Sequence, residues 1–96
     1  MISMKVIATR SFRDAYKRLP AHVRKMVDNT IDLLASNPYH PSLQAHRLHQ
    51  AKAEDVWSCY VSINKRLLYQ YKDGNIYLWD VGEHSVIERV RQRRFL

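Results

Sequence analysis

The sequence contains little glycine, proline and cysteine. Two glycines, three prolines and one cysteine occur among 96 residues, which is unlike fibrous or low-complexity chains. The single cysteine, Cys59, leaves no partner for an internal disulfide and fits a reducing compartment. We expect Cys59 to be a small buried apolar side chain rather than a nucleophile. The fold must therefore depend on a hydrophobic core, for which 46% of the residues are suited.

Long hydrophobic runs are also lacking. No apolar run approaches the roughly 18 to 20 residues that a membrane-spanning helix needs. The first residues, MISMKVIATRSF, lack the long apolar segment of a signal peptide. We therefore expect a cytoplasmic protein without a membrane partner. A length of 96 residues predicts a single domain, 1–96, with one small core.

Acidic residues are scarce relative to basic ones. Nine Asp and Glu stand against 16 Lys and Arg, so the formal net charge is +7. This excess favours an anionic partner, either nucleic acid or an acidic protein, although solubility alone is an alternative explanation.

Three short runs rich in Val, Ile, Leu, Tyr and Trp form the segment from Trp57 to Asp80. The dipeptide Asp73-Gly74 separates the second run from the third, and Asp-Gly is a strong hairpin signal because its turn needs positive φ. We predict an antiparallel meander with strands at 56–63, 66–72 and 75–81. The short β-prone run 4–8 could add a fourth strand.

Helical periodicity marks the segments between the first strand and the meander. Ser11 can cap a short amphipathic helix, which Pro20 ends because proline cannot continue a helix. A longer amphipathic helix is predicted at 21–36, so the two helices form a hairpin. Residues 41–55 form a polar connector, and connectors of this length are often functional.

The C-terminal residues predict a basic helix or tail. Ser85 and Glu88 have the spacing of a capping box at the start of the segment 85–94. In the meander, Leu67 and Tyr69 alternate with Arg66, because side chains alternate between the faces of a sheet. If the helical hairpin covers the Leu67 side, Arg66 lies on an open face, as do Ser58, Tyr60 and Ser62, whereas Trp57, Cys59, Val61 and Ile63 face the helices.

This order of elements resembles the RelE/ParE superfamily of bacterial toxins from type II toxin–antitoxin systems. The motifs that carry the resemblance are Trp57-Ser58, Arg66-Leu67-Leu68-Tyr69 and Val81-Gly82-Glu83-His84. The closing Gly-x-His-Ser is most similar to the YafQ branch, whose members are ribosome-dependent messenger RNA endonucleases. The resemblance implies an α+β, RelE-like fold. Its parts are an N-terminal strand, a two-helix hairpin, a three-stranded antiparallel meander and a short basic C-terminal segment.

By this resemblance, Arg66 matches an arginine near the scissile phosphate in many RelE-like nucleases, although YafQ has another residue there. His84 matches a histidine that YafQ-like toxins use in acid–base chemistry, and His46 lies where that branch has a further active-site histidine. The sequence also departs from the pattern. Cys59-Tyr60 stands where Tyr-Arg is common, and Glu88 stands where YafQ has an aromatic ring that Phe95 could replace.

Metal-independent RNA cleavage needs a base for the 2′-OH, a cation for the transition state and an acid for the leaving 5′ oxygen. Histidine suits both proton transfers, and arginine suits the phosphate. We predict His84 as the general acid or base, Arg66 as the phosphate-binding cation and His46 or His49 as the second proton-transfer group. No strong metal-ligand spacing occurs, so we expect neither a metal site nor a cofactor.

Further residues are expected to contact RNA through phosphate binding or base stacking. They are His49, Arg47, Lys52, Lys65, Tyr60, Arg94 and Phe95. An acidic antitoxin could cover the same basic surface, so the expected partners are a cognate antitoxin and messenger RNA on the ribosome.

Simpler explanations exist for each candidate. His84 could cap a helix or lie exposed after a glycine turn, and Arg66 could pair with Asp80 or Glu83. At the level of function, the alternatives are a ParE-like inhibitor of DNA gyrase and a catalytically decayed toxin-like domain that binds an antitoxin.

Overall fold

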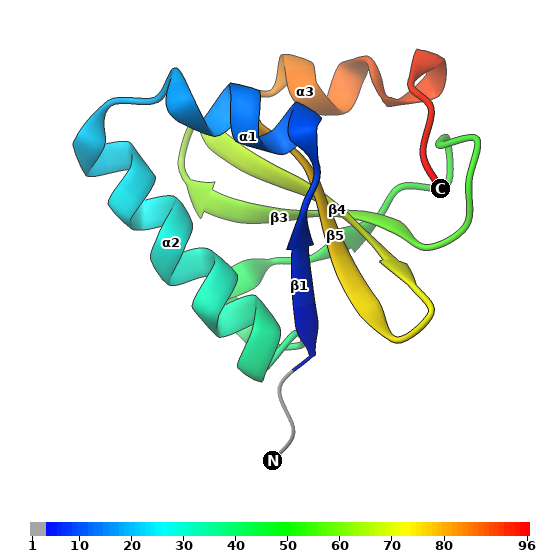
Figure 1. Cartoon of the computed structure of the whole chain (residues 1–96), viewed down its shortest axis with the longest axis horizontal. Coiled ribbons are helices and arrows are strands. Elements are labelled where there is room, and N and C mark those ends of the chain that lie inside the picture. The colour runs from blue at the N-terminus through cyan, green and yellow to red at the C-terminus, as the bar shows by residue number, and fades with distance from the viewer. Residues whose placement is uncertain (1–3) are drawn as a thin grey trace.

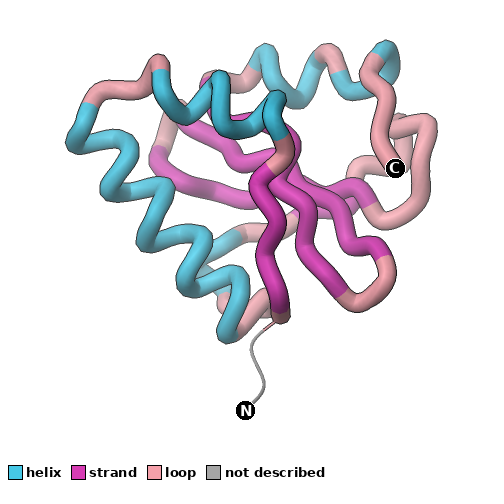
Figure 2. The backbone as a smooth tube through the Cα atoms, in the orientation of Figure 1, coloured by secondary structure: helices cyan, strands magenta, loops and turns pink. Residues whose placement is uncertain are grey.

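A computed structural model describes residues 4–96, which contain a five-stranded sheet in the order β1-β5-β4-β3-β2 (Figures 1 and 2). The strands are β1 (Lys5–Ala8), β2 (His46–Arg47), β3 (Val56–Ser62), β4 (Lys65–Lys72) and β5 (Asn75–Gly82). β1 is parallel to β5, and the other neighbours are antiparallel. The predicted α+β class, N-terminal strand and meander are confirmed.

The helical segments comprise a hairpin and several short pieces. They are α1 (Arg10–Lys17), α2 (Ala21–Ser36), η1 (Pro41–Leu43), α3 (Ser85–Glu88) and η2 (Val90–Gln92). The hairpin of α1 and α2 is confirmed, with Pro20 between the two helices at the N-cap of α2. None of the helices in residues 4–96 is long and apolar enough to pass through a membrane.

The two turns of the meander differ in how well the sequence predicts them. Asp73 and Gly74 both have positive φ, 52° and 78°, as a tight hairpin turn between β4 and β5 requires. The turn between β3 and β4 contains Ile63, whose exposed fraction is 85%, and Lys65 already belongs to β4. Ile63 was therefore wrongly predicted to face the helices, because a register shift between Tyr60 and Ser62 ends β3 earlier.

The cap of α1 is Thr9 rather than Ser11, which lies inside the helix. The Thr9 hydroxyl accepts a hydrogen bond from the backbone N–H of Phe12 at 3.2 Å and donates one to the carbonyl of Leu78 in β5 at 2.7 Å. Thr9 has extended backbone angles, as an N-cap requires. This residue therefore starts the helix and ties it to the sheet at the same time.

The sheet has a hydrophobic core on each face. The first lies under α1 and α2 and includes Val27, Leu34, Leu67 and Tyr69, all fully buried. The second lies under α3 and η2, which cross the other face (Figure 1). Its buried members are Leu48, Val56, Leu68, Val86 and Val90.

The second core corrects the expectation of an open face. Val86 of α3 and Val90 of η2 are both buried in one cluster with Leu68, so the two segments together cover this part of the sheet. Burial of each such side chain contributes roughly 1.5–3 kcal/mol, which explains why this face is closed. Ser58 is also buried there, whereas Tyr60 and Arg66 remain half-buried at the end of the face.

The C-terminal segment and the connector also differ from the prediction. Instead of one helix over 85–94, α3 ends at Glu88 and η2 follows as a separate turn. His84 is the N-cap of α3 and Ser85 already lies in the helix, so the predicted capping box is absent. The connector 41–55 contains η1 and the short edge strand β2, which pairs with β3.

Candidate functional site

Arg66 lies at the start of β4, directly opposite Tyr60 of β3 and Gly82 of β5. Its guanidinium carbon is 5.0 Å from the centre of the Tyr60 ring. Its Nη1 donates hydrogen bonds to the carbonyl of Ser62 at 2.7 Å and to that of Lys65 at 3.0 Å. The Arg66 cation is therefore fixed by a ring and two neutral carbonyls.

No carboxylate in residues 4–96 forms an ion pair with Arg66. The alternative that Arg66 pairs with Asp80 is wrong, because Asp80 accepts a hydrogen bond from Arg93 at 2.6 Å. The guanidinium therefore keeps its charge available for an external anion.

His84 lies two residues after Gly82, at the same end of the sheet as Arg66. It is exposed, and its side chain makes no capping hydrogen bond to α3. Gly82 allows α3 to pack closely, since a Cβ atom at this position would lie 3.1 Å from Cγ2 of Val86. The packing of Val86 thus holds the His84 turn against the end of β5.

His46 lies in β2 directly opposite Ser58 of β3. Side chains that oppose each other in an antiparallel pair lie on the same face, so His46 shares a face with Tyr60 and Arg66. The His46 and Tyr60 positions are two residues apart along the sheet, which is about 7 Å. His46 is exposed. The predicted catalytic residues therefore lie on β2, on β4 and after β5, and β2 and β5 are three strand spacings, about 14 Å, apart across the sheet.

The other predicted RNA contacts do not form one group. Lys65 precedes Arg66 in β4, so the alternation of the strand sends its side chain to the other face. His49 is exposed in the turn after β2. Lys52, Arg94 and Phe95 line a cavity of about 420 Å³ between the connector and the C-terminal segment. Arg47 lies apart from the residues that line this cavity.

Arg47 opposes Trp57 and therefore projects to the face that α1 and α2 cover. It forms an exposed ion pair with Asp55 at 3.5 Å. The structure does not bring Arg47 together with His46, its neighbour in the sequence.

Cys59 is buried, with an exposed fraction of 1%. Burial raises the pKa of its thiol to about 12, and the nearby charge of Arg66 reduces this rise only in part. Because the thiolate is the nucleophilic form, Cys59 is a core residue, as predicted. In residues 4–96, no three His, Cys, Asp or Glu side chains come together in a way that could hold a metal ion.

Gln70 lies in β4 with an exposed fraction of 1%, and its role was not predicted from the sequence. Its amide holds the end of the C-terminal segment, as Leu96 both donates to Oε1 and accepts from Nε2. The signal in the sequence was a single amide between Tyr69 and Tyr71 in an apolar strand. A buried amide needs hydrogen-bond partners from other segments, but the sequence does not identify them.

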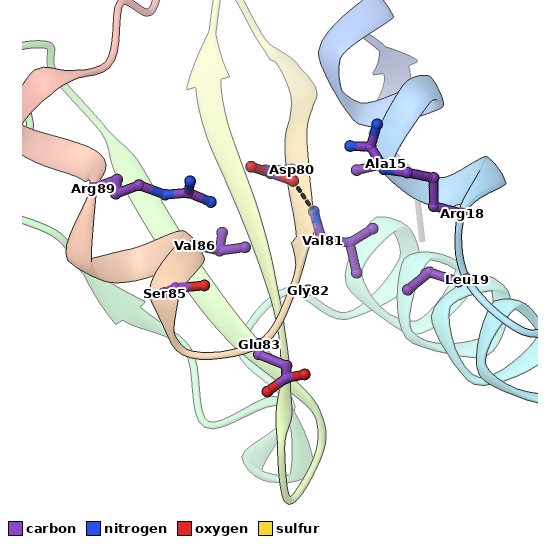
Figure 3. A pocket seen from close by; sticks show the side chains of 10 residues that line it. All are labelled: Ala15, Arg18, Leu19, Asp80, Val81, Gly82, Glu83, Ser85, Val86 and Arg89. Atoms are coloured by element: carbon purple, nitrogen blue, oxygen red, sulfur yellow. Dashed lines mark hydrogen bonds between the residues drawn. The ribbon is translucent and has the colours of Figure 1, made fainter.

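A groove of about 400 Å³ separates α1 from α3, and we call it the α1–α3 groove (Figure 3). The guanidinium groups of Arg18 and Arg89 extend into it from opposite walls, with Asp80 between them. The Asp80 carboxylate already binds Arg93 and the backbone N–H of Val81. Ala15, Leu19 and Val86 supply apolar lining. The groove therefore combines an apolar lining with two cations, Arg18 and Arg89, and two carboxylates, Asp80 and Glu83.

Comparisons with known proteins identify the fold. The sequence matches no family model and no curated protein. Among solved structures, YafQ in the E. coli DinJ-YafQ toxin-antitoxin complex has a TM-score of 0.70 and 16% identity, over 88% of this chain and 97% of that one. The archaeal RelE-RelB complex from Pyrococcus horikoshii gives a TM-score of 0.67 and 16% identity, over 97% and 100%.

The YoeB/ParE toxin from Agrobacterium tumefaciens is similar to the same degree, with a TM-score of 0.67 and 19% identity over 84% of this chain and 99% of that one. The agreement extends over nearly the whole length of each structure. The chain therefore has the fold of the RelE/ParE toxin superfamily, as its motifs predicted, and the YafQ structure is among its neighbours.

Proposed function

We propose that this protein is the toxin of a type II toxin–antitoxin pair and cleaves translated messenger RNA on the ribosome. The observation that carries the proposal is the position of Arg66 and His84. Both lie at one end of the sheet, Arg66 without a carboxylate partner in residues 4–96 and His84 exposed. A guanidinium without a carboxylate partner, at the same end of the sheet as an accessible imidazole, suits a phosphodiester better than a purely structural role.

The reaction is an attack of the 2′ oxygen on the adjacent phosphorus. One imidazole takes the proton of the 2′-OH, the new P–O bond forms, and the bond from phosphorus to the 5′ oxygen breaks. A second imidazole gives its proton to the departing oxygen. The products are a 2′,3′-cyclic phosphate and a free 5′-OH.

In this scheme His84 and His46 are the two proton-transfer groups, with His49 as the alternative to His46. Arg66 offsets the negative charge that grows on the phosphate oxygens. The ring of Tyr60 and the carbonyls of Ser62 and Lys65 hold the guanidinium, so little reorganisation is needed when substrate binds.

The proposal is tested by expressing the protein from an inducible promoter in a bacterial host. We expect growth and translation to stop, and we expect Arg66→Ala or His84→Ala to restore growth. Lys17→Ala is the matched control, because it removes an exposed cation on α1. If both site variants arrested growth as strongly as the unmodified protein, the assignment of the site would be wrong.

The same induction distinguishes the gyrase alternative. A ParE-like inhibitor needs no acid or base, so His84→Ala would remain toxic and a DNA-damage response would appear while messages stay intact. A decayed domain would cause no arrest at all.

We also propose an acidic antitoxin as partner and the α1–α3 groove as one of its contacts. The apolar lining fits an aliphatic side chain of a peptide, and Arg18 and Arg89 fit acidic residues that flank it. The test is co-expression with the product of the neighbouring gene. Arg18→Glu with Arg89→Glu should weaken the complex at least tenfold, whereas Lys17→Glu with Lys25→Glu should not. If both double variants bound the antitoxin with equal affinity, the α1–α3 groove would not be part of the interface.

A further inference from the structure

The cavity between the connector and the C-terminal segment lies apart from Arg66 and His84. Lys52 lines it from the connector, and Gln92, Arg94 and Phe95 line it from the C-terminal segment. We propose that this cavity, the distal cavity, binds the sugar–phosphate backbone of single-stranded RNA a few nucleotides from the bond that is cut. The inference rests on the proposed nuclease function and extends it to a second contact with the same strand.

The charge of the lining favours a polyanion. Lys52 and Arg94 form no ion pair within residues 4–96, and Arg93 is the one cation of the lining that already has a carboxylate partner, Asp80. No carboxylate lines the cavity. With a volume of about 420 Å³ and two free cations on different segments, it can contact neighbouring phosphates from two sides.

The surface beyond Leu96 has the opposite charge. A second cavity of about 300 Å³ lies there, lined by the carboxylates of Glu54, Asp55 and Asp73 and by one cation, Lys72, so acidic side chains predominate. A phosphate backbone would be repelled from this side. An RNA strand in the distal cavity is therefore directed away from Leu96 and towards the end of the sheet that holds Arg66.

The buried amide of Gln70 fixes the two walls of the distal cavity relative to each other. Its Nε2 donates to the carbonyl of Glu54 in the connector at 3.2 Å and to that of Leu96 at 3.0 Å. Its Oε1 accepts from Trp79 Nε1 at 3.1 Å and from the backbone N–H of Leu96 at 3.2 Å. One amide thus holds the connector and the C-terminal segment together, and Lys52 and Arg94 need little ordering when RNA binds.

Arg93 supports the same arrangement from the other side of the C-terminal segment. Its guanidinium bonds to Asp80, to the carbonyl of Trp79 at 2.9 Å and to the hydroxyl of Ser11 in α1. Phe95 packs edge-on against Trp79, with ring centres 5.4 Å apart. Because Phe95 is only half-buried and lines the cavity, part of its ring is available to a base.

The spacing between the two sites suits a short stretch of RNA. Gln70 does not line the distal cavity, but its amide binds Glu54 and Leu96, which are two residues from Lys52 and Arg94, respectively. Gln70 is four residues from Arg66 in β4, which is about 13 Å and gives the scale of the separation. Stacked nucleotides advance about 3.4 Å each along one strand, so about four stacked nucleotides, or fewer extended ones, cover this distance. An oligomer that fills only the Arg66 site is therefore too short to reach Lys52 and Arg94.

Binding of labelled 2′-O-methyl oligoribonucleotides tests the proposal, because these probes lack the attacking 2′-OH and stay intact. Fluorescence anisotropy would compare a probe of about three nucleotides with one of about nine, between about 50 and 200 mM salt. The test variant is Lys52→Ala with Arg94→Ala, both exposed positions, and the control is Lys17→Ala with Lys25→Ala on the helical hairpin.

We expect the test variant to bind the long probe with a weaker salt dependence than the unmodified protein. For single strands each lost phosphate contact lowers the logarithmic salt slope by about 0.7, so two contacts make a difference of about sevenfold in affinity over this range. The short probe should bind the test variant and the unmodified protein equally. The control should behave as the unmodified protein does with both probes.

The proposal is wrong if the long probe shows the same salt dependence with the test variant as with the unmodified protein. It is also wrong if the short probe loses as much affinity as the long one, or if an acidic peptide of equal charge displaces the long probe as well as unlabelled RNA does. The test variant could show the expected weaker salt dependence while Arg66→Ala and His84→Ala remain toxic. In that case the catalytic assignment is wrong, and RNA binding by the distal cavity is still supported.

Discussion

Tyr60 and Arg66 oppose each other across β3 and β4, and the Arg66 guanidinium lies 5.0 Å from the centre of the Tyr60 ring. The ring of Tyr60 holds the charge of Arg66 in place. Contacts of this kind contribute about 0.5–1 kcal/mol at exposed sites.

The first prediction concerns this pair. Tyr60→Ala should reduce toxicity about two- to fivefold, because the free energy of holding Arg66 is lost. Tyr60→Phe should retain full toxicity, since it keeps the ring. Measured rates of message cleavage would check both variants, and an effect of Tyr60→Phe as large as that of Tyr60→Ala would assign the role to the hydroxyl.

A second prediction concerns stability at high pH. Burial raises the pKa of the Cys59 thiol from 9.0 to about 12 and that of the Tyr71 hydroxyl from 10.0 to about 12. The unfolded chain loses these protons at lower pH than the folded chain does. The contribution of these two groups to the free energy of unfolding is therefore fully present below about pH 9 and is lost between about pH 9 and 12. The part due to Cys59 is about 4 kcal/mol.

Denaturant titrations at several pH values measure this dependence. The variant Cys59→Ala removes one of the groups with a raised pKa and should show a shallower decline above pH 9. A decline of equal steepness in Cys59→Ala would assign the effect to the tyrosines alone.

The third prediction concerns Gln70. Gln70→Leu keeps the size of the side chain but leaves the N–H groups of Trp79 and Leu96 and the carbonyl of Glu54 without partners. We expect the free energy of unfolding to fall by about 2 kcal/mol, which lowers the melting temperature by about 8–16 °C in a domain of this size. A change below about 0.5 kcal/mol would show that this amide network does not stabilise the fold.

The fourth prediction compares the contributions of Thr9 and Ser11, two hydroxyl residues at the start of α1, to the stability of the fold. Thr9→Ala removes the cap of α1 and its bond to Leu78, so it should cost about 1–2 kcal/mol of stability. Ser11→Ala removes one exposed contact with Arg93 and should cost less than about 0.5 kcal/mol. Thermal unfolding of both variants tests this prediction. If Ser11→Ala destabilised the protein more than Thr9→Ala, Ser11 would be the cap of α1.

Local patterns in the sequence were sufficient for most of the fold. Asp73-Gly74 predicts its hairpin because the turn depends on two neighbouring residues, and Pro20 predicts the break between α1 and α2 for the same reason. The closed second face was missed, because the pairing of Val86 and Val90 with Leu68 is long-range. No local pattern specifies which face of the sheet a short segment will cover.

The site was predictable only to the level of residue type and order along the chain. His46, Arg66 and His84 were named from a resemblance. The register adds that Arg66 lies opposite Gly82, just before His84, and that His46 shares the face of Arg66 but lies opposite Ser58, further along β3. Arg47 shows the limit of such reasoning. It is adjacent to His46 in the sequence, but the alternation of a strand sends it to the other face.

The most direct test is to map the ends of a defined message in a purified translation reaction. With the unmodified protein we predict discrete cuts at codons that ribosomes occupy, with 5′-OH ends, and no cuts when ribosomes are omitted. Arg66→Ala and His84→Ala should abolish these cuts, and Lys17→Ala should not. If the message stays full-length while ribosomes translate it in the presence of the unmodified protein, the nuclease account is contradicted.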